Sequence, residues 1–137
     1  MVNVTPNNRL NVLLAHDSEG WQDNVRRLLE PQGVQTLAVR SGREALEIIQ
    51  STPVHVAVLD QQMPHLGGLQ VIRLLRDQKN APTSILLANH LTDHLLHEAL
   101  GMRVFSVLSK PVDLNMLLDA LARVLRKRYA SRWPSES

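Results

Sequence analysis

The sequence predicts an α/β fold, a doubly wound (βα)5 sandwich in which helices cover both faces of a parallel sheet. Five short apolar runs alternate along the chain with five segments whose apolar residues recur at helical spacing. The connections between these segments are short, and no repeat or linker interrupts the alternation. A chain of 137 residues can bury the core that one domain of this kind needs. These observations together favour five consecutive strand–helix units.

Local signals set the expected bounds of each unit. The strands are expected at residues 11–15, 34–39, 54–59, 84–88 and 104–108, and the helices at about 19–30, after Ser41, at 68–78, at 92–101 and after Asp113. Ser18, Ser41 and Asp113 are suited to be N-caps, the second of them in a capping box with Glu44. The first helix is expected to bury a face that carries Trp21, Val25, Leu28 and Leu29, and to end at Pro31 and Gly33. Around the domain at residues 11–129, we expect a flexible N-terminus (1–10) and a C-terminal tail (130–137).

Composition excludes several classes of protein. Cysteine is absent, which excludes disulfides and thiolate metal sites and is typical of a reducing compartment. The sequence contains no apolar run long enough to span a membrane and no leader pattern, so we expect a cytoplasmic protein without membrane contact. The net charge is only +2, and the basic run at residues 126–128 complements the dipole at the end of the last predicted helix. Direct binding of nucleic acid is therefore not expected.

Polar residues follow four of the predicted strands. His16 and Asp17 follow the first strand, Asp60 ends the third, Asn89 follows the fourth and Lys110 follows the fifth. In open parallel sheets, ligands bind just beyond the carboxyl ends of the strands. Asp60 is the expected centre of a site, because it is a single carboxylate at the end of an apolar run and a turn rich in proline and glycine follows it.

At these positions the chain resembles the receiver domain of two-component response regulators, over about residues 11–129. The segment Asp60-Gln61-Gln62-Met63-Pro64, with Gly68 after it, matches the family's D-x-x-M-P-x-x-x-G pattern. Lys110-Pro111 matches the family's lysine at the end of the fifth strand, and Asp17 matches the second member of its acidic pair. The resemblance implies a flavodoxin-like sheet of order 2-1-3-4-5, and a bacterial signalling protein rather than an enzyme.

The resemblance also implies a role for each matching residue. Asp60 is expected to accept a phosphoryl group from a phosphohistidine, and Lys110, aimed by a cis peptide bond to Pro111, to stabilise the phosphoryl oxygens. Asp17, Asp60 and the backbone carbonyl of Gln62 are expected to hold Mg²⁺. The expected partners are a histidine kinase or phosphotransfer protein, and a downstream protein that binds the face formed by the fourth helix, fifth strand and fifth helix. A homodimer is a further candidate assembly.

Three positions depart from the family pattern. His16 stands in place of the first acidic residue, Ala88 in place of a hydroxyl residue, and Val107 in place of an aromatic switch residue. Losing one carboxylate removes up to ~3 kcal/mol of attraction for a cation, so Mg²⁺ binding is expected to be weakened rather than abolished. The imidazole suits Zn²⁺, Cu²⁺ or Ni²⁺ better, whereas a ring that points to solvent would leave the metal preference unchanged. Glu19 is a candidate substitute for the missing carboxylate.

These departures leave alternatives open. A degenerate pseudo-receiver would bind partners without phosphorylation, whereas an unrelated flavodoxin-like enzyme ranks last because no glycine-rich phosphate loop follows the first strand. His90, His94 and His97 fall on one side of the fourth predicted helix, and a solvated histidine-rich face is favoured there over a transition-metal site or a pH-sensitive partner surface. Trp21 is expected to pack at the edge of the core rather than to bind a ligand.

Overall fold

The computed structural model describes residues 9–130, so the expectations for residues 1–8 and 131–137 lie outside the described part of the chain. The strands are β1 (Leu10–Ala15), β2 (Val34–Val39), β3 (Val56–Asp60), β4 (Thr83–Ala88) and β5 (Ser106–Ser109). The helices are α1 (Glu19–Leu29), α2 (Gly42–Ser51), α3 (Gly68–Leu75), α4 (Asp93–Gly101) and α5 (Leu114–Tyr129). The predicted alternation of strands and helices is confirmed. Within the described residues, no helix is long and apolar enough to cross a membrane.

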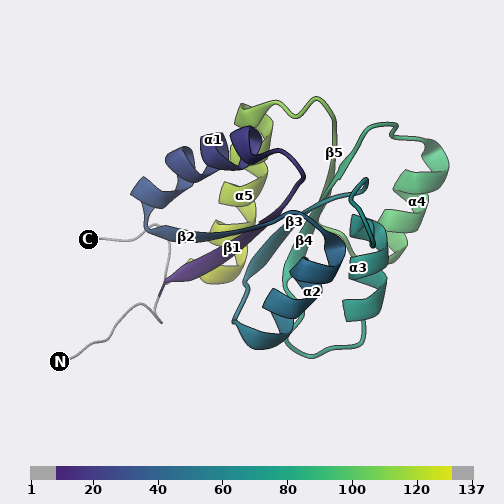
Figure 1. The fold of residues 1–137 in the computed structure, drawn as a ribbon, viewed down its shortest axis with the longest axis horizontal. Helices are drawn as coiled ribbons and strands as arrows, with labels where there is room; N and C mark the ends of the chain where they lie inside the picture. Colours follow the sequence, from purple (N-terminus) through teal and green to yellow (C-terminus); the bar gives the residue numbers. More distant parts are fainter. Residues whose placement is uncertain (1–8, 131–137) are drawn as a thin grey trace.

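All five strands run parallel in one sheet of order β2-β1-β3-β4-β5, as predicted. β3 is the middle strand, between β1 and β4. The register pairs Ala15 with Leu59 and Asp60 with Leu87, so that β1, β3 and β4 end at the same edge of the sheet. Figure 1 shows α1 and α5 on one face of the sheet and α2, α3 and α4 on the other.

Alternate residues of the strands supply two hydrophobic cores, one on each face. The core beneath α1 and α5 takes from the sheet Leu10, Val12, Leu14, Val34, Val56, Val58, Ile85, Leu87 and Leu108. The core beneath α2, α3 and α4 takes from it Leu13, Ala15, Val39, Ala57, Leu59 and Leu86. β3 is buried on both faces along its whole length, as a central parallel strand requires. Asp60 therefore ends a strand that has no contact with solvent.

The N-terminal end of α1 connects the ends of two strands. Its buried face contains Gln22, which is 4% exposed, whereas Leu28 is 41% exposed, so the expectation that Leu28 is buried is wrong. The Gln22 amide nitrogen lies 3.2, 2.9 and 2.7 Å from the carbonyl oxygens of Leu14, His16 and Val39. Polar burial thus replaces apolar burial at this end of α1, because the amide donates to backbone carbonyls at the ends of β1 and β2.

Several element bounds differ from the prediction by a few residues. β1 begins at Leu10, whose side chain is buried, and not after it. α1 ends at Leu29 because a 3₁₀ turn with Pro31 in its first turn follows, and α3 ends at Leu75 where the chain enters hydrogen-bonded turns. β3 begins at Val56 rather than at residue 54, and β5 at Ser106 rather than at residue 104. Val54 and Val104 are buried without pairing in the sheet, which explains why their hydrophobicity was misleading.

The predicted N-caps are confirmed, with one difference in their partners. Ser18, Ser41 and Asp113 each accept a backbone N–H from the first turn of the following helix. Glu44 does not complete the expected capping box with Ser41, because its carboxylate accepts the backbone N–H of Arg40 at 2.9 Å. The carboxylate still satisfies an N–H at the start of α2, one residue earlier than the box would.

The turn between β3 and α3 brings backbone against backbone. A Cβ atom on Gly68 would lie 2.8 Å from the carbonyl oxygen of Asp60, and one on Gly67 would lie 2.4 Å from that of Gln61. The side chain of Gln61 accepts the N–H of Leu69 at 3.0 Å and so caps the first turn of α3. This close approach requires glycine and fixes the course of the chain directly after Asp60.

Candidate phosphoryl-acceptor site

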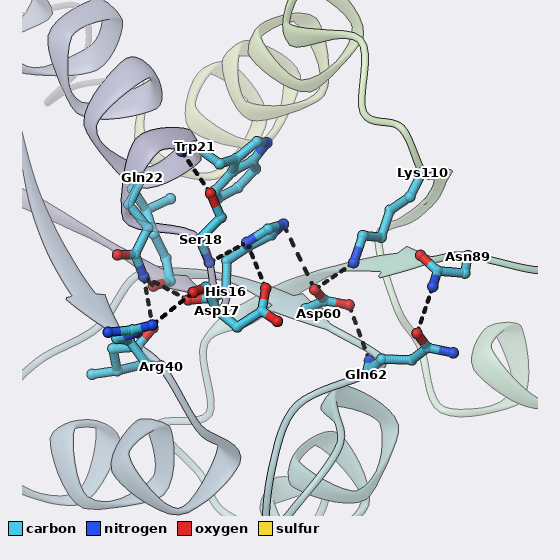
Figure 2. A network of polar contacts seen from close by, with 12 residues as sticks. His16, Asp17, Ser18, Trp21, Gln22, Arg40, Asp60, Gln62, Asn89 and Lys110 are labelled. Carbon is cyan, nitrogen blue, oxygen red and sulfur yellow. Dashed lines mark hydrogen bonds and ion pairs between the residues drawn. The ribbon is translucent and has the colours of Figure 1, made fainter.

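The Asp60 carboxylate is fully buried and surrounded by N–H groups. Its Oδ2 lies 2.7 Å from Nζ of Lys110, and its Oδ1 accepts the backbone N–H of Gln62 at 3.0 Å. His16 faces the same Oδ2 from the opposite side, with its Nε2 at 3.7 Å. Figure 2 shows Asp60 between His16 and Lys110, at the edge where the strands end. The structure thus brings together Asp60, Lys110, His16 and Asp17, which come from three different strand ends.

Lys110 reaches Asp60 from the loop after β5. Its backbone N–H donates to the carbonyl of Ala88 at 2.8 Å, which extends the β4–β5 ladder by one residue. The peptide bond between Lys110 and Pro111 is cis, as expected. The side chain is 20% exposed, so part of it remains in contact with solvent. Lys110 is therefore the more accessible of the two side chains that contact Oδ2 of Asp60.

His16 is buried, with 7% of its surface exposed. Its imidazole stacks on the indole of Trp21, with ring centroids 4.3 Å apart and planes inclined by 13°. Its Nδ1 accepts the backbone N–H of Ser18 at 3.0 Å. The alternative in which this ring points to solvent is therefore wrong, because stacking and a hydrogen bond hold it beside Asp60. Trp21 is partly buried at the edge of the core, as predicted.

The hydrogen bond from Ser18 decides which ring nitrogen of His16 carries a proton. Nδ1 accepts, so it holds no proton, and the neutral ring carries its proton on Nε2. Burial lowers the pKa of His16 below its ordinary value of 6.5, and Lys110 lowers it further, against the opposing effects of Asp60 and Asp17. The ring is therefore neutral at neutral pH. The 3.5 Å separation between Nδ1 and Oδ1 of Asp17 then joins two acceptors and is not an attractive ion pair.

Two of the residues at this edge fit a hard divalent cation. Within the described part of the chain, His16, Asp17 and Asp60 are the only group of three or more histidine, aspartate or glutamate residues whose ligand atoms, one from each residue, all lie within 4.8 Å of one another. Carboxylate oxygens are the ligands that Mg²⁺ prefers, so Asp17 and Asp60 fit this ion. The imidazole does not, because Nδ1 is already an acceptor for Ser18 and Nε2 presents a proton.

Glu19 does not replace the carboxylate that His16 displaces. Its side chain is 74% exposed, and its carboxylate lies 3.8 Å from the guanidinium of Arg40. Arg40 also donates to the backbone carbonyl of Asp17 at 3.1 Å. The candidate substitution by Glu19 is therefore not formed in this structure, and Arg40 is a contact of Asp17 that the sequence did not indicate.

The side of the site formed by β4 contains no hydroxyl group. Ala88 is 1% exposed at the end of β4, and Val107 packs into the core beneath α2, α3 and α4. Asn89 donates its amide to the side chain of Gln62, which links the two loops beside Asp60 (Figure 2). This side therefore offers an amide pair at the surface, where the family pattern has a hydroxyl.

The histidines near α4 do not belong to this site. His90 precedes the helix, which begins at Asp93, and all three histidines are exposed. His94 lies 4.0 Å from Glu98, whose carboxylate also pairs with Arg73 of α3 at 2.6 Å. These facts agree with the solvated face favoured from the sequence.

Sequence reasoning missed the group that holds His16 in place. The N–H of an N-cap residue is often satisfied by a glutamate or glutamine three residues later, but that position after Ser18 is Trp21. His16 supplies the missing acceptor. The absence of an acceptor at the third position of the helix, together with a histidine two residues before the cap, was the signal that could have identified this contact.

Comparison with known proteins agrees with the site. The profile of the response regulator receiver domain matches residues 12–122. Response regulator RR06 of Streptococcus pneumoniae is 27% identical over 125 residues, which cover 88% of this chain and 55% of that protein. The positive alginate biosynthesis regulatory protein of Pseudomonas aeruginosa is 32% identical over 120 residues, covering 85% of this chain and 48% of that protein. The chain thus spans about half the length of these relatives.

Solved structures give the same result. The chemotaxis response regulator CheY4 of Vibrio cholerae has a TM-score of 0.76 at 26% identity, covering 85% of this chain and 99% of that one. The signal receiver domain of a putative Luxo repressor protein from Vibrio parahaemolyticus has a TM-score of 0.82 at 20% identity, covering 90% of this chain and 95% of that one, which is a likeness of fold. With a family match over most of its length and the predicted strand order, this chain belongs to the response regulator receiver domain family.

Proposed function

We propose that this chain is the phosphoryl-accepting receiver of a two-component phosphorelay and that Asp60 takes the phosphoryl group. The observation that carries the proposal is a carboxylate with 0% exposure at the end of the central strand, 2.7 Å from the ammonium group of Lys110. Burying such a pair costs solvation energy that packing alone does not recover. A pair held at the carboxyl edge of a parallel sheet therefore supports a chemical role.

The proposed reaction moves a phosphoryl group from a phosphohistidine nitrogen to an oxygen of Asp60. The P–N bond breaks, its electron pair stays on the nitrogen, which takes up a proton, and a P–O bond forms to the carboxylate. Positioning and charge stabilisation provide most of the catalysis in such transfers. The N–H of Gln62 holds Oδ1, and Lys110 can follow the negative charge from Oδ2 to the phosphoryl oxygens.

Asp17 and Asp60, with the backbone carbonyl of Gln62, are the residues proposed to hold Mg²⁺, which would offset the repulsion between carboxylate and phosphoryl oxygens. The Asp17 side chain is 63% exposed, so it can approach a cation without leaving a buried position. His16 contributes no carboxylate, which supports weakened binding of the ion.

A phosphodonor reaches Asp60 only when one of its neighbours moves. The Lys110 side chain is 20% exposed and ends in a flexible four-carbon chain, whereas the His16 side chain is 9% exposed and stacked on Trp21. We therefore assign the movement to Lys110. The imidazole stays in place while the lysine exchanges one negatively charged partner for another.

Input and output are proposed to pass through other proteins. One relative, CqsS of Vibrio cholerae, is described as an autoinducer sensor kinase/phosphatase and is 28% identical over 116 residues, which cover 81% of this chain and 17% of that protein. The input partner proposed here is a histidine kinase or a phosphotransfer protein. The output partner is proposed to bind the α4–β5–α5 face, and the two helices that border it each carry an exposed apolar side chain, Leu100 on α4 and Met116 on α5, both 58% exposed.

Intact-protein mass spectrometry tests the proposal. On incubation with phosphoramidate and millimolar Mg²⁺, the chain is expected to gain the mass of one phosphoryl group, and Asp60→Asn is expected to gain none. Asp119→Asn is the matched control, because Asp119 is an exposed aspartate on α5 whose partner is Arg123. Absence of the adduct in the unmodified chain, with the fold intact by circular dichroism, would contradict the proposal and favour a pseudo-receiver that binds partners without phosphate.

A further inference from the structure

The imidazole of His16 presents an N–H group that no described residue uses. Its proton lies on Nε2, because Nδ1 accepts from Ser18. Nε2 faces Oδ2 of Asp60 at 3.7 Å, which is too long for a hydrogen bond, and within the described chain it donates to no other acceptor. The side chain is more than nine-tenths buried. In the described chain, the buried side-chain atoms without a partner are Oδ1 of Asn11 and Nε1 of Trp21, so Nε2 of His16 keeps a small surface open to solvent. An N–H that faces Asp60 and is not yet paired within the protein is placed to donate to an acceptor that arrives there.

The ring is also held in this orientation. Trp21 stacks on one of its faces at 4.3 Å, the N–H of Ser18 fixes Nδ1, and the amide of Gln22 lies 2.9 Å from its backbone carbonyl. Rotating the ring to solvent would break the stacking and leave the N–H of Ser18 without this acceptor. A donor fixed in this way loses little conformational entropy when an acceptor binds.

We propose that the Nε2–H of His16 donates a hydrogen bond to the phosphoryl group on Asp60 and supplies part of the stabilisation that a divalent cation supplies. The inference rests on the proposed transfer of a phosphoryl group to Asp60. With phosphoramidate, the P–N bond breaks, the leaving nitrogen takes its electron pair and a proton from water, and a P–O bond forms to Asp60. No proton moves to or from His16. Because this hydrogen bond does not depend on a cation, transfer to Asp60 is expected to continue, more slowly, when metal is removed.

The tautomer is tested on the unmodified chain. Long-range proton–nitrogen NMR correlation distinguishes an imidazole protonated on Nε2 from one protonated on Nδ1. At neutral pH, His16 is expected to show the Nε2–H form, and beryllofluoride, a phosphoryl mimic, is expected to shift the Nε2 resonance and leave that of Nδ1 in place. An Nδ1–H tautomer, or an Nε2 resonance that beryllofluoride does not move, would overturn the inference.

Phosphorylation in the presence of a chelator tests the role of the N–H. With phosphoramidate and excess EDTA, His16→Ala is expected to be phosphorylated about ten- to a hundred-fold more slowly than the unmodified chain. His16→Asp is expected to lose the same metal-free rate, to bind Mg²⁺ more tightly in calorimetry, and to show a larger stimulation by Mg²⁺. His97→Ala is the matched control, since His97 is exposed on α4.

Trp21 is a positioning residue, and its variants separate orientation from folding. Trp21→Leu removes the stacking ring and is expected to lower the metal-free rate, whereas Trp21→Phe keeps an aromatic face and is expected to restore most of it. If His16→Ala does not fold, the comparison of these two variants still tests the inference. Equal metal-free rates in both would contradict it.

The outcomes separate this inference from the function on which it rests. If the unmodified chain is phosphorylated with Mg²⁺ but not with EDTA, and His16→Ala behaves in the same way, the proposed function stands and the inference is overturned. A chain that is phosphorylated under neither condition overturns the proposed function. A metal-free rate that falls in His16→Ala and in Trp21→Leu, but not in His97→Ala, supports both.

Discussion

The two strand ends that flank Asp60 have each lost a residue of the family pattern, and only one has a replacement built into the site. At the end of β1, His16 is buried, stacked on Trp21 and bonded to Ser18, and it faces the carboxylate at 3.7 Å. At the end of β4, Ala88 is an apolar residue with 1% exposure. Its neighbour Asn89 binds the side chain of Gln62 and not Asp60.

This difference separates the chemistry of the site from its output. The β1 side and Lys110 present N–H groups to the carboxylate of Asp60, where the proposed function requires groups that stabilise a phosphoryl oxygen. The β4 side lacks the hydroxyl that the resemblance associates with transmission to the surface, and Val107 stands in place of the family's aromatic switch residue. We therefore expect substitution of Lys110 to lower stability strongly, and a hydroxyl introduced at Ala88 to add an interaction with the phosphoryl group.

The largest effect on stability is expected from Lys110→Ala. The change leaves a fully buried carboxylate without its 2.7 Å partner, and removing one member of a buried ion pair typically costs about 3 kcal/mol or more. Because Lys110 is 20% exposed and water can enter the space it leaves, we expect the free energy of unfolding to fall by about 2–3 kcal/mol. Urea denaturation at neutral pH measures the difference.

Two further variants show whether this loss comes from the buried charge. Asp60→Asn combined with Lys110→Ala removes both charges and should be more stable than Lys110→Ala alone. Arg123→Ala breaks an exposed pair with Asp119 and should cost less than about 1 kcal/mol. If the double variant is less stable than Lys110→Ala alone, the loss of stability in Lys110→Ala does not come from an unpaired buried charge on Asp60.

A smaller effect is expected from restoring a hydroxyl at the end of β4. In Ala88→Thr the hydroxyl would lie beside a charged phosphoryl group, and such a hydrogen bond is worth about 1.5–3 kcal/mol, so affinity for beryllofluoride should rise about ten-fold or more. Ala88→Val has the same shape without the hydroxyl and is the matched control. Calorimetric titration measures both, and equal affinities would show that the β4 side cannot reach the phosphoryl group.

The sequence was sufficient for the fold because each element carried its own signal. β3 is a β-branched and apolar run buried on both faces, and the caps at Ser18, Ser41 and Asp113 are local patterns. The exceptions have tertiary causes. Leu28 fits an apolar stripe, but that side of α1 faces solvent, and Gln22 is buried because three strand-end carbonyls lie beside it.

The site was predictable in its parts but not in its contacts. The pairing of Lys110 with Asp60 joins residues 50 positions apart, and the order of strand ends implied by the resemblance was enough to expect it. The orientation of His16 was not predictable, because it depends on an N–H of Ser18 and on where Trp21 lies after α1 packs on the sheet. Side-chain direction at a strand end is decided by such neighbours and not by sequence spacing.

The smallest effect is expected from Glu19→Ala, which tests whether the β1 side recruits a second carboxylate. Glu19 is 74% exposed and pairs with Arg40 at 3.8 Å, an arrangement that contributes little to stability. Its removal should leave Mg²⁺ affinity within about two-fold of the unmodified chain, because a screened surface charge contributes little to a cation held by other groups. Asp17→Ala should weaken the same affinity about ten-fold or more, because it removes one of the two carboxylates that fit the ion. A large loss in Glu19→Ala would mean that Glu19 leaves Arg40 when the cation binds, and that His16 is compensated by a carboxylate after all.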